Sequence, residues 1–201
     1  DWLYKMFGID AELLIDHAWG YETCRMSDIK NYHSEEHSLS NGQVLMRNYS
    51  FEEALVIVRE MTDNLALDLF EKGLVTNSLT LWIAYDHRYE HEASKGTVKL
   101  ERESNSSKKI IDAVEDLYLR ITDRYTGIRR IEVCANRVAP ESYVQYSLFD
   151  DPKQTDKERH LQEAVLNVKQ RYGKNAIMRG SNLLECSTYR ERNEQIGGHR
   201  A

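Results

Sequence analysis

The ionisable residues whose spacing could support catalysis are carboxylates in the middle of the chain. Asp112, Glu115 and Asp116 lie close together in the sequence, and paired carboxylates can hold the two metal ions of phosphoryl transfer. Such carboxylates are expected on adjacent strand ends or loops, whereas these three lie on the polar face of a predicted helix. A solvated surface is the usual environment of such residues. We therefore predict no catalytic residue in this chain.

Two histidine pairs have a spacing that metal sites use. His33 and His37, and also His87 and His91, are four residues apart, which would place both rings on one side of a helix. The first pair falls in a predicted linker or strand and the second in a loop, so we predict no metal ligand. The sequence also has no glycine-rich phosphate loop, no nucleophile elbow and no Cys-His-Asp set. No cofactor is therefore expected in this chain.

Polar and cationic side chains on the outer face of a predicted sheet are better candidates for a binding site. Hydroxyls, one flat aromatic ring and a few cations suit contacts to the phosphates and sugars of DNA that do not read bases. The predicted residues are Ser38, Ser40, Thr80, Trp82, Thr97, Lys99 and Arg130. Glu101 and Glu132 on the same predicted face oppose DNA binding, so an ordinary solvated face is the alternative.

A second candidate is the short peptide Gln145–Phe149, which Asp150 and Asp151 follow. Pro140 and Pro152 bracket it and disfavour a continuous helix or a central strand. An extended peptide with one amide and two apolar side chains can fill a pocket on another protein. Its predicted contact residues are Gln145, Ser147, Leu148 and Phe149. The alternative is a tail that folds back onto its own domain.

Composition limits the function classes. The 201 residues are 41% hydrophobic and 30% charged, as in a globular protein, and no apolar run approaches the roughly 20 residues of a membrane span. The net charge of −6 argues against a simple basic nucleic-acid binder, although acids concentrate in residues 51–72. Cys24, Cys134 and Cys186 are too far apart for a zinc finger. We expect a cytoplasmic protein without membrane contact and, because Asp1 is not Met, a piece of a longer chain.

The periodicity of the apolar residues predicts the elements that carry these sites. Strands are expected at residues 34–45, 79–85, 97–101 and 130–135, with Asn41-Gly42 as a turn or bulge. Helices are expected at residues 51–72, after the capping box of Ser50 and Glu53, and at 108–126, before Gly127. This order of elements predicts an α+β fold, in which two helices cover one face of a four-stranded split β-α-β sheet.

The flanking segments are predicted to be helical. Two short helices joined at Gly8 should end at Gly20, and a further helix should begin at a capping box of Thr155 and Glu158. The stripe of that helix is Leu161, Val165, Val168 and Tyr172. The last stretch, from Arg190 to Gly198, is polar, and the sequence does not decide whether residues 174–201 are ordered. The expected organisation is residues 1–22, a linker at 23–33, the sheet domain at 34–138, a linker with the peptide at 139–154, and a helix with its tail at 155–201.

In this order the chain resembles the C-terminal half of a Y-family translesion DNA polymerase of the UmuC/DinB (ImpB/MucB/SamB) group. Residues 3–22 resemble the helix-hairpin-helix at the end of the thumb. His37 to Ser40, the helix after Ser50, the strand 79–85 and residues 128–138 resemble the little finger. Residues 145–151, Q-Y-S-L-F-D-D, resemble the motif that docks on the bacterial sliding clamp.

The resemblance implies a role in DNA repair and SOS damage tolerance. The full protein would be a nucleotidyltransferase, and Mg²⁺ would bind in a catalytic palm that this sequence lacks. This chain would hold primer-template DNA by its backbone and tether the enzyme to the clamp, without polymerase activity of its own. Trp82 and Cys134 depart from the family, which often has basic residues at those positions. A non-catalytic DNA-binding or clamp-interacting module, or a protein-interaction domain, is the alternative.

Overall fold

The computed structural model describes residues 2–31, 37–88, 91–142, 151–196 and 199–200. Contacts divide the chain into two compact units, residues 1–36 and residues 37–201. None of the helices among the described residues is long and apolar enough to cross a membrane.

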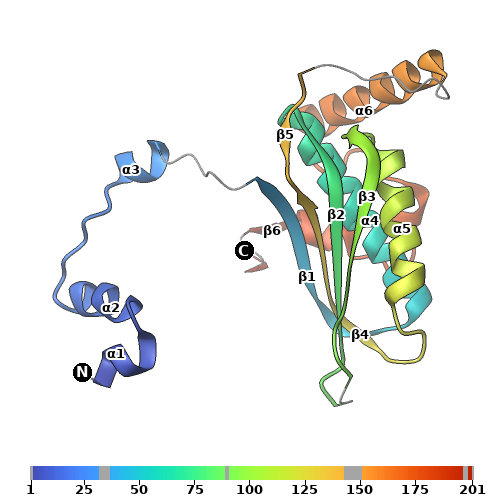
Figure 1. Cartoon of the computed structure of the whole chain (residues 1–201). Coiled ribbons are helices and arrows are strands. Elements are labelled where there is room, and N and C mark those ends of the chain that lie inside the picture. The colour runs from blue at the N-terminus through green and yellow to red at the C-terminus, as the bar shows by residue number, and fades with distance from the viewer. Residues whose placement is uncertain (1, 32–36, 89–90, 143–150, 197–198, 201) are drawn as a thin grey trace. The chain divides into compact units, whose positions relative to one another are not determined.

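The first unit consists of three short helices, α1 (Trp2–Phe7), α2 (Asp10–Ala18) and α3 (Met26–Asn31) (Figure 1). The predicted break at Gly8 is confirmed: its φ of 57° is a conformation that glycine adopts without a steric cost. Helix α3 lies within residues 23–33, where the sequence has no apolar period and a linker was predicted. The local reason is a cap-like contact, in which the Asp28 carboxylate accepts a hydrogen bond from the Arg25 N–H.

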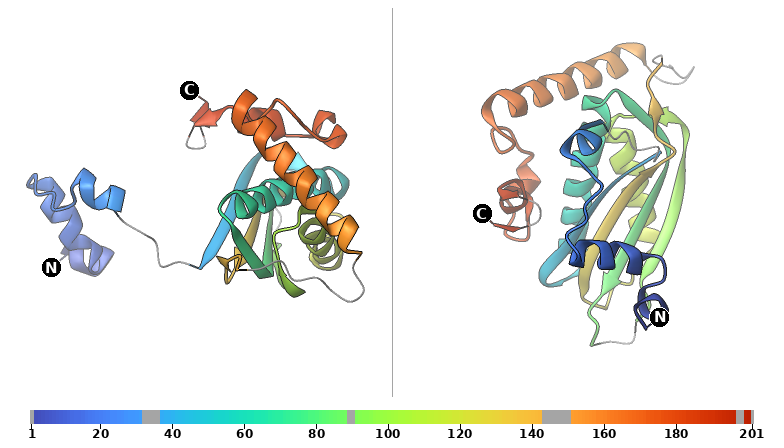
Figure 2. Two further views of the ribbon diagram at one scale, coloured as in Figure 1. Left: turned by 90° about the horizontal axis from the view of Figure 1, so that it is seen from above. Right: turned by 90° about the vertical axis from the view of Figure 1, so that its left-hand side faces the viewer.

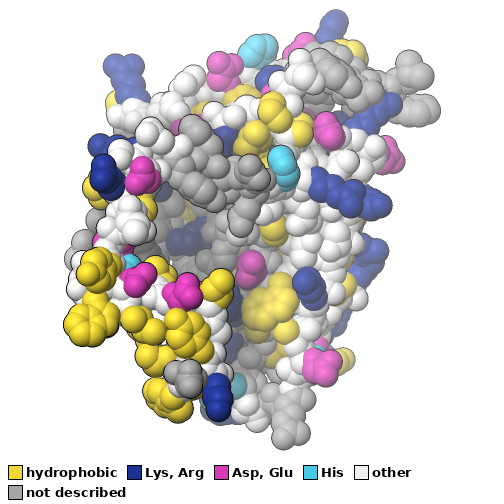
Figure 3. Space-filling model, turned by 60° about the vertical axis from the view of Figure 1, so that its left-hand side comes forward, with side chains coloured by type: hydrophobic (Ala, Val, Ile, Leu, Met, Phe, Trp, Pro, Cys, Tyr) yellow, Lys and Arg dark blue, Asp and Glu magenta, His cyan; other side chains and the backbone are white. Residues whose placement is uncertain are grey.

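This unit buries almost nothing. Ala11 is its only buried residue among those described, and large apolar side chains gather on its surface (Figure 3). The most exposed are Trp2, Ile9, Trp19, Tyr21 and Met26. The unit therefore gains little stability from its own core, because apolar stabilisation grows with the area removed from water.

The second unit contains an antiparallel sheet in the order β1-β4-β2-β3. Its strands are β1 (Ser38–Tyr49), β2 (Leu74–Tyr85), β3 (Ser94–Ser104) and β4 (Ile128–Asn136), and β5 (Ala139–Pro140) pairs with the start of β2. Since β1 and β2 both run antiparallel to β4, which lies between them, the split β-α-β arrangement is confirmed. The predicted turn at Asn41-Gly42 is wrong, because both residues pair with β4. The irregularity lies instead between Val44 and Tyr49.

Helices α4 (Phe51–Glu71) and α5 (Ser107–Ile121) cover one face of the sheet, as predicted (Figures 1 and 2). The expected capping box at Ser50 and Glu53 begins α4. Helix α5 ends five residues earlier than predicted, because the Asp123 carboxylate accepts hydrogen bonds from the Tyr125 and Thr126 N–H groups and forms a turn. Tyr125, assigned to the apolar stripe, is consequently exposed.

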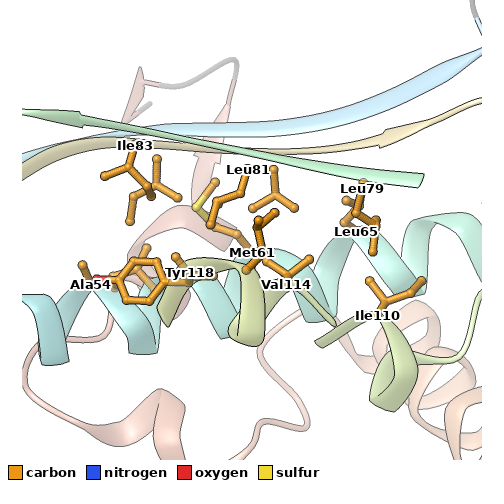
Figure 4. Close-up of a cluster of buried hydrophobic side chains, with 14 of the residues drawn as sticks. Ala54, Met61, Leu65, Leu79, Leu81, Ile83, Ile110, Val114 and Tyr118 are labelled. Atoms are coloured by element: carbon orange, nitrogen blue, oxygen red, sulfur yellow. The ribbon is translucent and has the colours of Figure 1, made fainter. Parts of the chain in front are cut away.

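The core fills the space between these helices and the sheet. Figure 4 shows Leu79, Leu81 and Ile83 of β2 pointing towards Met61 of α4 and Tyr118 of α5. All five side chains are fully buried. The Tyr118 hydroxyl donates a hydrogen bond of 2.8 Å to the Phe51 carbonyl, so its polar end is satisfied inside the core.

The C-terminal segment contains α6 (Pro152–Tyr172), the 3₁₀ helix η1 (Gly180–Leu183), α7 (Tyr189–Asn193), β6 (Gln195–Ile196) and β7 (His199–Arg200). The predicted start of α6 is wrong, because Asp151 caps the helix by accepting from the Lys153 N–H and Pro152 suits the first turn. The predicted stripe is also wrong: Leu161 and Tyr172 are exposed, and Gln162 is the buried residue.

Helix α6 crosses α4 (Figure 2), and Gln162 donates hydrogen bonds to the carbonyls of Ala66 and Asn105. The sequence did not decide whether the segment that follows is ordered, and its described residues form regular structure. They form η1 and α7, in which Asn182 and Tyr189 are buried. Polar side chains order this segment because α4 offers them polar partners.

Candidate nucleic-acid interface on the open face of the sheet

The strand register determines which side chains share the face that α4 and α5 leave uncovered. Leu79, Leu81 and Ile83 point towards the helices, so the alternate residues of β2 point the other way. Cα pairing aligns these outward residues in rows across the sheet. In the order β1, β4, β2 and β3, the rows are Ser38–Asn136–Ser78–Lys99, Ser40–Cys134–Thr80–Thr97, Gly42–Glu132–Trp82–Lys95, and Val44–Arg130–Ala84 without a partner in β3.

All seven residues predicted from the sequence lie in these rows: Ser38, Ser40, Thr80, Trp82, Thr97, Lys99 and Arg130. We call the surface formed by the four rows the open face. Three further members of the open face were not predicted from the sequence: Asn136, Ser78 and Lys95. They lie at polar strand ends, where the backbone pairing continues beyond the apolar alternation that predicts a strand. A longer strand at either end would have identified all three.

Hydrogen bonds connect the side chains of the two serine- and threonine-containing rows. The Asn136 amide Nδ2 donates to Thr80 Oγ1 at 2.8 Å and to Ser78 Oγ at 3.4 Å. Thr80 Oγ1 lies 2.9 Å from Thr97 Oγ1 on the neighbouring strand. The hydroxyls of β2 and β3 are therefore ordered relative to each other before any ligand binds.

The cation of the fourth row is held by its neighbours. The Arg130 guanidinium lies 5.1 Å from the centre of the Trp82 ring, a cation–π distance. Its Nη2 is also 3.6 Å from a carboxylate oxygen of Glu132. Trp82, the residue that departs from the family pattern, thus positions a cation. Glu132 reduces the positive charge of the open face, while Lys95 and Lys99 add to it along the edge strand β3.

The remaining departure, Cys134, is not an ionised group on this face. Burial, and then the nearby Glu132 carboxylate, raise the pKa of the Cys134 thiol. It therefore stays protonated at neutral pH, and its Sγ donates to Asn136 Oδ1 at 3.4 Å. The reactivity of a thiol depends on its thiolate form, so Cys134 acts here as a weak hydrogen-bond donor.

The residues considered for catalysis do not come together. Glu115 forms a salt bridge with Arg59, as expected on a solvated helix face, and no group of three or more His, Cys, Asp or Glu side chains within the described ranges could hold a metal ion. His91 packs on the Tyr85 ring, at 4.3 Å between ring centres. His33 lies outside the described residues.

The candidate clamp-binding residues Gln145, Ser147, Leu148 and Phe149 also lie outside the described residues, which stop at 142 and resume at 151. The chain is anchored on both sides of this gap. Glu141 accepts two hydrogen bonds from the Arg159 guanidinium of α6, at 2.7 and 2.9 Å. Asp151 caps the same helix.

Comparisons with known proteins agree with the family resemblance. Residues 36–148 match the impB/mucB/samB family C-terminal domain. The chain is 25% identical over 203 residues to DNA polymerase IV 2 of Bacillus subtilis (strain 168), covering 99% of this chain and 47% of that protein. It is 21% identical to DNA polymerase IV 2 of Halalkalibacterium halodurans, covering 83% and 40%. The chain thus spans about half the length of the curated relatives that it matches.

Similar solved structures include a complex of the beta-clamp processivity factor with the little finger domain of PolIV. The identity is 11%, the TM-score is 0.41, and the match covers 57% of this chain and 100% of that one. The post-insertion binary complex of Dbh DNA polymerase gives 15% identity and a TM-score of 0.37, covering 70% and 39%. The family match covers 36–148 of the 201 residues, and on that match the chain belongs to the impB/mucB/samB family and carries its C-terminal domain.

Proposed function

We propose that this chain is the part of an error-prone translesion DNA polymerase that holds primer-template DNA and tethers the enzyme to the bacterial sliding clamp. Its place would be in the cytoplasm, in DNA repair and SOS damage tolerance. The supporting observation is the open face of this family's domain. There the register of the four strands places hydroxyl side chains beside cationic ones. Such groups suit the sugar-phosphate backbone, whose contacts position a protein without reading sequence.

The charge balance sets the expected strength of DNA binding. The whole chain has a net charge of −6, and Glu132 lies among the cations of the open face. Binding by this chain should be weak, independent of sequence and strongly reduced by salt, since phosphate contacts dominate such binding. The dissociation constant should fall in the range of about 10⁻⁶ to 10⁻⁴ M.

The test reverses the two best-placed cations, as Lys99→Glu with Arg130→Glu. Fluorescence anisotropy with a labelled primer-template should show a loss of about tenfold or more at low salt. The slope of log affinity against log salt should fall by about 2, because two phosphate contacts are lost. The matched control is Lys108→Glu with Lys109→Glu on α5, which changes the net charge equally on the helical side. Equal losses from both pairs would overturn the assignment of the open face.

For the clamp, the supporting observations are the Q-Y-S-L-F sequence and the anchored chain on both sides of it. A peptide with two apolar anchors can supply a few kcal/mol through burial, at about 25 cal/mol per Å². Binding also fixes the backbone and side chains of the peptide, which offsets part of this gain, so the affinity for the clamp should be modest, on the order of micromolar.

The test is Leu148→Ala with Phe149→Ala, measured by surface plasmon resonance on immobilised bacterial clamp. We expect binding to be lost and the melting temperature to stay unchanged. Leu183→Ala with Leu184→Ala is the matched control, because these adjacent leucines are exposed and lie in the C-terminal segment, outside the peptide. A peptide variant that still binds the clamp, or that unfolds the domain, would contradict the assignment of Leu148 and Phe149 to clamp binding and favour the alternative, a tail that folds back onto its own domain.

Catalysis belongs to the longer protein in this proposal. The described residues hold no cluster suited to a metal ion, so we assign no step of nucleotidyl transfer to this chain. The Mg²⁺ site would lie in the palm, outside these residues. Primer extension by the purified chain, with Mg²⁺ and nucleotides, should yield no product, whereas extended primer would contradict this division of roles.

A further inference from the structure

The hydrogen bonds of the open face have a direction that follows from the chemistry of one residue, Asn136. Its amide nitrogen can only donate, so Thr80 Oγ1 is the acceptor of their 2.8 Å hydrogen bond. At the other end of the side chain, Asn136 Oδ1 accepts from the Cys134 thiol. In this orientation the amide nitrogen faces two hydroxyls and the amide oxygen faces the thiol, whose sulfur also lies 3.7 Å from the Ala135 carbonyl oxygen.

The direction continues onto the edge strand. Either hydroxyl can donate in the 2.9 Å hydrogen bond between Thr80 Oγ1 and Thr97 Oγ1; in one of the two directions Thr80, which accepts from Asn136, donates its one proton to Thr97. Thr97, which is exposed on β3, then keeps its own proton for a partner outside the sheet. Each hydrogen bond in such a chain polarises the next one, so the last hydroxyl becomes a better donor.

We propose that Asn136 is a positioning residue for nucleic-acid binding, which acts by directing the Thr97 hydroxyl proton towards a phosphate oxygen. This inference rests on the function proposed above. A phosphodiester oxygen only accepts hydrogen bonds, so Thr97 can bind it only when its proton points outward. Lys99 is two residues further along the same strand and on the same face, where its charge attracts the same backbone.

The raised pKa of the Cys134 thiol supports this arrangement. Because burial keeps the sulfur protonated, it remains a donor to the Asn136 carbonyl oxygen at neutral pH. A thiolate there would instead attract the amide nitrogen and turn the side chain around. The chain of hydrogen bonds therefore begins at the Cys134 thiol, which stays protonated at neutral pH.

The experiment is a double-mutant cycle in the primer-template binding assay. Thr97→Val removes the outward hydroxyl and Asn136→Ala removes the group that directs it. Each should weaken binding about tenfold or more, as expected for a hydrogen bond to a charged group. If Asn136 acts through Thr97, the double variant loses no more than Thr97→Val alone, since coupled residues are not additive.

Two further readouts separate positioning from general damage. Thr97→Ser should retain wild-type affinity, because it keeps the hydroxyl. The salt dependence of binding should stay unchanged in both single variants, because neither removes a charge. If Asn136→Ala lowers the melting temperature, Asn136→Leu replaces it in the cycle, since it keeps the approximate side-chain size, adds no charge and cannot donate.

The outcomes distinguish this inference from the function on which it rests. Additive losses in the cycle, or unchanged affinity in Asn136→Ala, would overturn the role of Asn136 while the effect of Lys99→Glu with Arg130→Glu persists. Loss of that charge effect would instead overturn the DNA-binding role of the open face. Non-additive losses, with rescue by Thr97→Ser, would support both.

Discussion

Helix α4 packs on two sides, and the two contacts are built from different chemistry. On the side of the sheet, Ala54, Met61 and Leu65 are fully buried against β2 and β4. On the side of the C-terminal segment, the contact is polar. Glu60, which is 2% exposed, accepts hydrogen bonds from Asn182 Nδ2 at 3.1 Å and from the Ser187 hydroxyl.

The two contacts differ in what holds them together. Apolar packing depends on volume and area, so many combinations of similar residues would serve. A buried carboxylate is costly unless its partners are in place, so the polar contact tolerates few alternatives. Helix α4 thus packs on the sheet through apolar burial and on the C-terminal segment through specific hydrogen bonds.

The largest expected effect is the removal of apolar volume on the sheet side. Leu81→Ala should lower the free energy of unfolding by about 2–5 kcal/mol, because lost transfer energy and a residual cavity add together. Chemical denaturation monitored by circular dichroism measures this change. The control is Leu161→Ala, whose side chain is exposed on α6. A similar loss in both variants would contradict the assignment of the core to the α4–sheet contact.

A smaller effect is expected from the polar contact. Glu60→Ala should cost about 1–3 kcal/mol, because Asn182 and Ser187 lose their acceptor in a buried environment. Glu60→Gln should cost less, since its amide oxygen can still accept. Limited proteolysis should show faster cleavage after residue 173 in Glu60→Ala, with the sheet domain intact. Uniform protection of both regions would show that Glu60 does not hold the C-terminal segment.

The pH dependence of the polar contact should be weaker still and has a definite sign. Burial raises the pKa of Glu60 above its ordinary value of 4.5, although Ser187, Asn182 and the Arg192 guanidinium oppose the shift. A raised pKa in the folded state adds stability that is complete below the unfolded value and is lost as pH rises through the folded one.

Wild type should therefore lose stability relative to Glu60→Gln as pH increases from about 4 to 8. Urea denaturation of both proteins across that range measures the difference. The other titrating groups contribute equally to the pH dependence of both proteins, so their contributions cancel in the difference. A difference that grows in favour of wild type would mean that the charge of Arg192 outweighs burial at this site.

The sheet-side contact of α4 was predictable and the polar one was not, for physical reasons. Phe51, Met61 and Leu65 recur at helical spacing, and the alternation of Leu79, Leu81 and Ile83 reveals the face that meets them. Periodicity records burial in apolar surroundings. Glu60 and Gln162 are polar residues that become buried only because distant residues bond to them, and no local pattern encodes such partners.

The open face is an intermediate case. Outward positions such as Thr80 and Lys99 follow from alternation within one strand, so they could be assigned from the sequence. The contact of Asn136 with Thr80 depends on the register between β4 and β2, which alternation does not define. The sequence therefore predicted the members of this surface but not the hydrogen bonds that order them.

The smallest expected effect tests whether the exposed part of the polar contact matters. Arg179 donates two hydrogen bonds to Asp63 of α4, at 2.7 and 2.8 Å, but its side chain is 58% exposed. Arg179→Ala should cost no more than about 1 kcal/mol, because solvent and salt screen such pairs. The same denaturation assay, repeated at high salt, should reduce the cost further. A loss of stability as large as that of Glu60→Ala would mean that the exposed Arg179–Asp63 pair holds the C-terminal segment on α4. A small loss would mean that the buried Glu60 carboxylate holds it.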